Sequence, residues 1–132
     1  IKRGVFDTAK FDSVPELQLA KILERENDFV QKWLRPSATD FNITYNDGKN
    51  YEPDFVVETE KMNYLVEVKG EDKLNDPDVL AKKEKSVEYC KLVSKWAEET
   101  ENKKWTYVFI PASKITSKST FKYLSEYYAV KE

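Results

Sequence analysis

The sequence predicts an α/β domain in which a mixed β-sheet is flanked by α-helices. Helical and strand-like segments follow one another in the order α, β-hairpin, β, long α, β, α. The long helix is expected to cross between two parallel strands, while the hairpin supplies antiparallel pairing. The chain has 132 residues, enough for one hydrophobic core, so we expect a single domain over residues 1–132.

Apolar residues recur at three- and four-residue steps in the segments expected to be helical. The first helix starts at Ser13, which has capping-box spacing to Glu16. Phe29 to Leu34 predicts a second, short helix that ends before Pro36. The long helix is expected over residues 79–100 and a weaker amphipathic helix over residues 116–130.

Four runs are predicted to be strands: residues 41–45, 51–58, 64–69 and 105–110. The first two are separated by Asp47-Gly48, a strong hairpin signal. We therefore expect the run 51–58 to enter the same sheet as its neighbours.

The composition excludes several kinds of chemistry. The chain has no histidine and one cysteine, Cys90, so a Ser-His-Asp or Cys-His triad and a Cys/His zinc site are excluded. One cysteine cannot form a disulfide within the chain, which favours a reducing, cytoplasmic location. No apolar run is long enough to span a membrane. Any catalysis must use carboxylates, lysines, hydroxyls or a hard metal ion.

Charge is a weak guide to partners. The formal net charge is −2, yet residues 103–132 hold six lysines against two glutamates. A mildly acidic chain is not an obvious nucleic-acid binder by total charge. The lysines at 103, 104, 114, 118 and 122 favour a solvated face, with contact to phosphates as the alternative. The tryptophans and tyrosines favour core or inter-domain surface over base stacking.

Three charged residues lie at the ends of otherwise apolar strands. Asp54 follows Pro53, and Glu67 and Lys69 share one face of their strand while their neighbours face the core. Charged groups seldom occupy such positions without a partner. If the two strands are adjacent, Asp54 stands beside Glu67.

Two converging carboxylates repel each other, and a divalent cation removes that cost. Oxygen ligands suit Mg²⁺ or Mn²⁺. Such an ion beside Lys69 suits phosphodiester hydrolysis, because the ion acidifies bound water and the lysine orients the nucleophile or stabilises developing charge.

These residues resemble the PD-(D/E)xK nuclease signature, with Pro53-Asp54 followed by Glu67-Val68-Lys69. Over roughly residues 10–112 the chain is similar to the C-terminal endonuclease domain of the restriction subunit of type III restriction enzymes. The similarity lies in residues 51–57, 65–70, Tyr89-Cys90 and 105–111. The resemblance implies a restriction-endonuclease-like fold and site-specific cleavage of double-stranded DNA.

The resemblance also implies roles for particular residues. Asp54 and Glu67 would be metal ligands, the Val68 carbonyl a third ligand, and Lys69 the catalytic lysine. Glu16 would be an acid that supports the metal site, although its capping position alone also explains it.

A further lysine is implied on the long helix. Lys83 is the candidate because it shares a face with Val87, and Lys82 and Lys85 compete with it. A solvated lysine lying over apolar neighbours is the alternative explanation.

In that family the nuclease follows an ATP-driven helicase-like motor and acts with a methyltransferase that recognises the DNA site. The chain lacks a G-x-x-x-x-G-K-[ST] loop, so ATP would bind the motor, and we expect this chain to be a C-terminal piece of a larger helicase–nuclease. A dimer of nuclease domains is a further expectation. The alternatives are a non-catalytic module that docks DNA or the motor, and a repair or junction-resolving nuclease.

Overall fold

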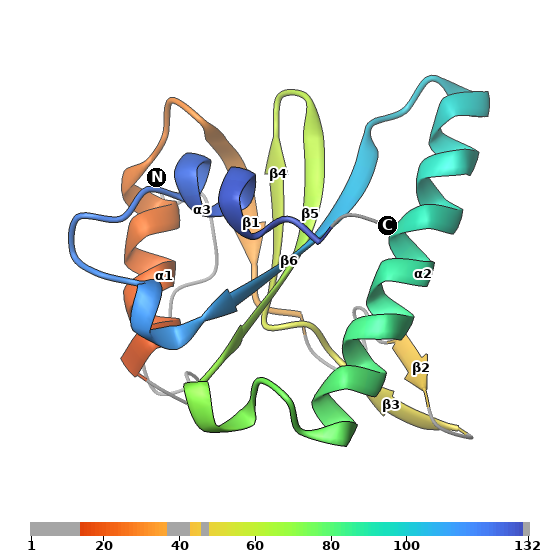
Figure 1. The fold of residues 1–132 in the computed structure, drawn as a ribbon. Coiled ribbons are helices and arrows are strands. Elements are labelled where there is room, and N and C mark those ends of the chain that lie inside the picture. The colour runs from red at the N-terminus through yellow and green to blue at the C-terminus, as the bar shows by residue number, and fades with distance from the viewer. Residues whose placement is uncertain (1–13, 37–42, 46–47, 131–132) are drawn as a thin grey trace.

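The computed structural model describes residues 14–36, 43–45 and 48–130. Within these ranges the chain forms three α-helices, a four-stranded sheet and a two-stranded hairpin (Figure 1). The helices are α1 (Val14–Arg25), α2 (Pro77–Thr100) and α3 (Phe121–Tyr128), and the strands are β1 (Val30–Leu34), β2 (Ile43–Tyr45), β3 (Lys49–Tyr51), β4 (Phe55–Thr59), β5 (Met62–Lys69) and β6 (Lys104–Pro111). Two short 3₁₀ turns, η2 (Glu71–Lys73) and η3 (Ala112–Lys114), follow β5 and β6.

The main sheet is mixed, with the strand order β1-β4-β5-β6. The pairs β1/β4 and β4/β5 are antiparallel, and β5/β6 is parallel. Helix α2 makes the crossover between the two parallel strands, as such a connection requires. The expected α/β class and the mixed sheet are therefore confirmed.

The helices cover both faces of this sheet (Figure 1). On one face α1 and α3 pack against the strands around Leu23, Val66 and Phe121. On the other face α2 and the β2–β3 hairpin enclose a second cluster that includes Leu65 and Tyr107. Alternate residues of β5 and β6 thus enter different cores, which is why both strands contain consecutive buried residues.

The short helix expected over Phe29–Leu34 is wrong, because β1 occupies this position. Val30 and Trp33 are both buried, and their spacing of three imitates a helical period. The spacing arises from a register irregularity between Val30 and Lys32 in the pairing with β4. A bulge adds one residue and so shifts the alternation of faces.

We expected residues 51–58 to form one strand of the main sheet, and this prediction is wrong. Tyr51 ends β3, which pairs with β2 in a separate sheet, and Phe55 begins β4 in the main sheet. Pro53 lies between them, and proline cannot donate a ladder hydrogen bond. The hairpin itself is present, with Gly48 at a φ of 100°, a left-handed conformation that glycine adopts readily.

The ends of the helices differ from the expected ones. Helix α2 starts at Pro77, where the Asp76 carboxylate accepts hydrogen bonds from two backbone N–H groups. Helix α3 is shorter than expected and starts after Thr120, whose hydroxyl accepts from the Tyr123 N–H at 3.2 Å. The expected capping residue Ser13 lies outside the described residues.

Two further features complete the fold. Beyond α3 the chain forms an isolated antiparallel bridge from Ala129 to Val108, and the Val130 N–H donates to the Tyr107 carbonyl at 2.8 Å. Among the described residues no helix has both the length and the apolar character needed to cross a bilayer.

Phe121 is expected to dominate the docking of α3. Its ring is fully buried and contacts those of Phe29 and Tyr64, with centroids 6.3 Å and 5.4 Å away. Phe121→Ala should lower the free energy of unfolding by about 3–5 kcal/mol, measured by urea titration. The control Tyr123→Ala removes an exposed ring from the same helix and should change it by less than about 0.5 kcal/mol. Equal losses would contradict this packing.

Candidate active site

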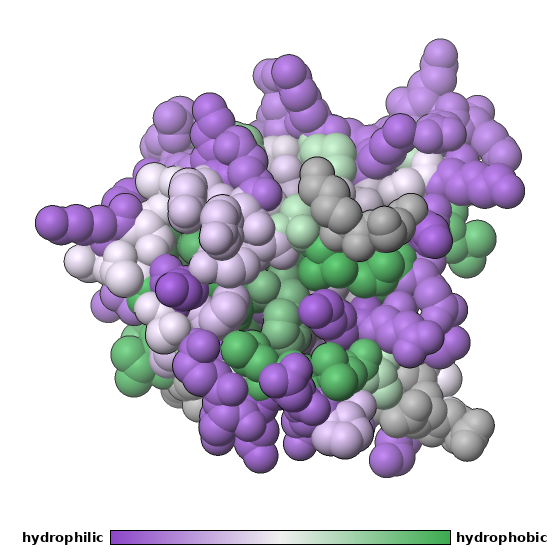
Figure 2. All heavy atoms as spheres, viewed as in Figure 1, coloured by the Kyte–Doolittle hydropathy of each residue, from purple (hydrophilic) through white to green (hydrophobic). Residues whose placement is uncertain are grey.

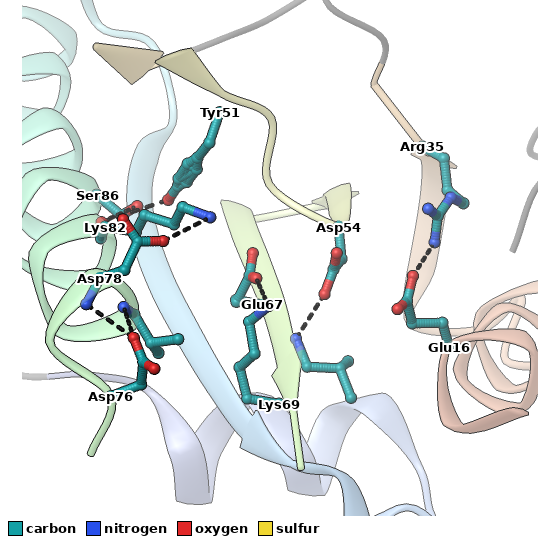
Figure 3. A network of polar contacts seen from close by, with 12 residues as sticks. Glu16, Arg35, Tyr51, Asp54, Glu67, Lys69, Asp76, Asp78, Lys82 and Ser86 are labelled. Carbon is teal, nitrogen blue, oxygen red and sulfur yellow. Dashed lines mark hydrogen bonds and ion pairs between the residues drawn. The ribbon is translucent and has the colours of Figure 1, made fainter. Parts of the chain in front are cut away.

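Asp54, Glu67 and Lys69 lie together at the carboxyl end of β5 (Figure 3). In the β4/β5 register Phe55 is opposite Val66, so the residue before β4 falls opposite Glu67. One Asp54 carboxylate oxygen accepts a hydrogen bond from the Val68 N–H at 2.8 Å. The structure therefore brings the three principal predicted residues to one place.

The Glu67 carboxylate is buried and only partly satisfied. The residue is 5% exposed, and its Oε2 lies 3.5 Å from the Lys69 ammonium. Its Oε1 is buried without a hydrogen-bond partner. Burial raises the pKa of Glu67 to about 7, against the opposing positive charges of Lys69 and Lys82.

The Asp54 carboxyl, like that of Glu67, has a raised pKa. Burial raises the pKa of its carboxyl well above the ordinary value, and the negative charges of Glu67 and Glu16 raise it further. The Val68 N–H and the Lys69 charge oppose this shift. Two acids that both favour the protonated form leave a site in which added positive charge is stabilising.

The atoms at this site fit a hard divalent cation. Asp54 and Glu67 offer carboxylate oxygens, including the unpartnered Glu67 Oε1. The Val68 N–H points towards Asp54, and the N–H and C=O of one strand residue point to the same side, so its carbonyl also faces the Asp54 side. Magnesium prefers such oxygen ligands, usually with one or two carboxylates and several waters.

The site holds two carboxylates rather than three. Glu16, on α1, is buried and forms an ion pair with the Arg35 guanidinium (Figure 3). Among the described residues no group of three or more Asp, Glu, His or Cys side chains is placed to hold a metal ion. Glu16 thus acts on Asp54 through its charge, while its carboxylate contacts Arg35.

The lysines of α2 reach this face of the sheet in different ways. Lys83 places its ammonium 4.9 Å from the centre of the Phe109 ring, and Phe109 is the β6 neighbour of Glu67. Lys82 lies 3.3 Å from Asp78, and its charge lowers the pKa of Glu67 (Figure 3). Both lysines are therefore close to the site, and the charge that acts on Glu67 is that of Lys82.

Sequence reasoning missed a group of buried hydroxyls beside Glu67. Tyr51 donates to the Lys82 carbonyl at 3.4 Å, and Ser86 donates to the same oxygen at 2.8 Å. The Tyr107 hydroxyl is buried beside the hydroxyls of Tyr51 and Ser86. Burial and the negative charge of Glu67 raise the pKa of both tyrosines. A tyrosine within an apolar strand, as Tyr107 is, was the available signal.

Comparisons with protein-family models, with curated proteins and with solved structures found no match to this chain. A function must therefore be argued from the residues of the site and their geometry.

The carboxylate pair should make the metal-free protein less stable as the pH rises. The folded state keeps the Glu67 proton up to a pKa of about 7, whereas an ordinary glutamate loses it near 4.5. The folded state therefore binds more protons in this interval, and the free energy of unfolding falls as the pH increases through it. Thermal unfolding in EDTA between pH 4.5 and pH 8 measures this slope.

Asp54→Asn should relieve the repulsion and raise the Tm in EDTA at pH 8 by about 3–6 °C. The amide oxygen can still accept from the Val68 N–H. Glu84→Gln is the matched control, because it removes one exposed negative charge from α2 and should leave the Tm nearly unchanged. A lower Tm for Asp54→Asn would mean that the carboxylate is not strained.

Proposed function

We propose that this chain is a metal-dependent endonuclease domain of the PD-(D/E)xK kind, which hydrolyses phosphodiester bonds of double-stranded DNA. The observation that carries the proposal is the side-by-side pair of half-buried Asp54 and buried Glu67, with Lys69 3.5 Å from Glu67 (Figure 3). A mixed sheet covered by helices on both faces, with Glu67 on the central strand β5 and Asp54 directly before the central strand β4, supports a restriction-endonuclease-like fold.

In this proposal the carboxylates of Asp54 and Glu67 and the Val68 carbonyl hold Mg²⁺, and Mn²⁺ can replace it. The bound ion would supply charge neutralisation at the phosphate and a more acidic water. The strained carboxylates bind it more readily, because binding replaces their mutual repulsion with attraction.

Lys69 positions or activates the attacking water and stabilises charge that develops on the phosphate. Its distance of 3.5 Å from Glu67 Oε2 is long for a charged hydrogen bond. The ammonium group, which is partly exposed, is therefore not committed to Glu67 and can contact a phosphate oxygen. Glu16 supports Asp54 electrostatically, and a lysine of α2, Lys82 or Lys83, adds positive charge.

The same proposal places the domain in a type III restriction enzyme. A helicase-like motor and a methyltransferase subunit would select the DNA site, because the described residues include no helix with the features of a base-reading module. ATP would be used by the motor alone.

One observation favours a non-catalytic module that docks DNA or the motor. Glu16 contacts Arg35, so no third carboxylate among the described residues completes the metal site. Metal binding separates the two functions, because a module that has lost its chemistry has no need to bind the ion.

Lys69→Ala should lower nicking of supercoiled plasmid in Mg²⁺ by about 100-fold or more, with its far-ultraviolet circular dichroism unchanged. Lys32→Ala is the control, since Lys32 is an exposed lysine on β1; it should nick at the wild-type rate.

Calorimetric titration with Mg²⁺ or Mn²⁺ completes the test. The wild type should bind the ion, and Asp54→Ala should abolish binding. A wild type that neither binds the ion nor nicks DNA would contradict the nuclease function, whereas binding without nicking would point to dependence on a motor or a second copy.

A further inference from the structure

Two tyrosines on α3 expose most of their surface to solvent. Tyr123 is 57% exposed and Tyr127 is 65% exposed. Their rings are stacked, with centroids 5.6 Å apart and an interplanar angle of 11°. Tyr128 supports the stack with its edge, at 4.7 Å and 74° to Tyr127. We call these three rings the tyrosine stack.

The stack is held on a well-anchored helix. The opposite face of α3 buries Phe121 and Leu124 in the core shared with α1. The Glu26 carboxylate, which follows α1, accepts hydrogen bonds from the Phe121 and Lys122 N–H groups at the start of α3. The exposed rings therefore have a fixed position before any ligand arrives, which lowers the entropic cost of binding.

Among the described residues the ring that stacks on Tyr123 is that of Tyr127. Tyr128 meets Tyr127 in turn, so the stack is supported at the Tyr127 end. Tyr123 is the other end of the row and is 57% exposed, so we place one more flat group against its outer face.

Positive charge lies next to the stack. Lys114, Lys118 and Lys122 are exposed on α3 and on the segment that leads into it. That segment is held by hydrogen bonds, including one from the Thr116 N–H to the Ser119 hydroxyl at 2.9 Å. Figure 2 shows weakly polar side chains gathered over α3, with strongly hydrophilic ones around them.

Acidic groups nearby are fewer. The Glu26 carboxylate already receives the two N–H groups of α3. Glu71 accepts a hydrogen bond from the Ser113 hydroxyl at 2.8 Å. Glu126 is the remaining exposed acid on α3 itself. These three carboxylates face the three lysines and Arg25, whose guanidinium donates to the Ser119 carbonyl at 3.0 Å. The surface therefore has a small excess of positive charge and suits an anionic ligand that also carries flat aromatic groups.

We propose that the tyrosine stack binds unpaired nucleotides of DNA. A base stacks on Tyr123 and extends the row of rings, and the adjoining phosphates contact Lys118 and Lys122. Aromatic platforms with a positive border bind single strands in this way, largely without regard to sequence. A duplex does not satisfy both requirements, because its bases are already stacked within the helix.

This inference deepens the proposed function and rests on it for the choice of DNA. It assigns the enzyme a substrate that contains a single-stranded stretch next to the duplex to be cut. The sequence predicted that the tyrosines lie in a core or on an inter-domain surface. The exposure of Tyr123 and Tyr127 excludes a core position for these two residues.

The test measures fluorescence anisotropy of a labelled oligothymidine and of a blunt duplex, both in EDTA so that no cleavage occurs. Tyr123→Ala/Tyr127→Ala should bind the oligothymidine about 5- to 50-fold more weakly than the wild type. Tyr123→Phe/Tyr127→Phe keeps the rings and should bind within about 2-fold of the wild type. Binding of the blunt duplex should be unaffected by either pair.

Lys118→Ala/Lys122→Ala tests whether these lysines neutralise phosphates of the bound strand. The slope of log affinity against log salt concentration should become shallower by about 0.7 for each phosphate of a single strand that the variant leaves without a lysine. All the variants change exposed side chains, so thermal unfolding should show that each remains folded.

Four results would overturn the inference. The wild type could fail to bind oligothymidine, or Tyr123→Ala/Tyr127→Ala could bind it as tightly as the wild type does. That variant could lose as much affinity for the duplex as for the single strand, or sedimentation could show a wild-type dimer that the variant no longer forms. The last would assign the stack to a protein interface. If the wild type neither binds the metal ion nor nicks the plasmid, but oligothymidine binding still depends on the tyrosine rings, the proposed function fails and this inference stands.

Discussion

The antiparallel pairing of β4 with β5 is the constraint on which the site depends. It sets Phe55 against Val66, and Asp54 lies one residue beyond the paired region. A slip of one residue would turn Glu67 into the core of α1 and α3 and put Val66 or Val68 in its place beside Asp54. The apolar residues on both faces of β5 thus fix the register, and the register fixes the carboxylates.

The metal-free protein is destabilised by this arrangement. Two acids are held where desolvation and repulsion favour their neutral forms. Lys69, Lys82 and the Val68 N–H compensate in part. Strain of this kind is common where a ligand provides the missing interaction. Added positive charge at this place would relieve the cost.

Much of the fold was predictable because most segments have one dominant pattern. The long helical period before a β-rich run predicted α2 and β6 closely, and Asp47-Gly48 predicted the hairpin. The helix predicted over residues 29–34 was wrong because a bulge gave the buried residues of a strand the spacing of a helix. The single strand predicted over residues 51–58 was wrong because Pro53 separates β3 from β4, and these strands lie in different sheets.

The candidate site was predictable only in part. Strand alternation alone placed Glu67 and Lys69 on one face, and the structure agrees. The preference for Lys83 over Lys82 could not be decided by periodicity, since both lie on the side of α2 that faces the sheet. The Arg35 partner of Glu16 could not be foreseen, because it depends on how β1 lies beside α1.

The bridge between Ala129 and Val108 has a consequence for assembly. An exposed edge strand of a sheet can pair with a strand of a neighbouring molecule, which leads to aggregation. Here residues 129–130 pair with the middle of the edge strand β6. The other edge strand, β1, has a register irregularity beside Lys32. Self-association by strand addition to the main sheet is thus discouraged on both sides.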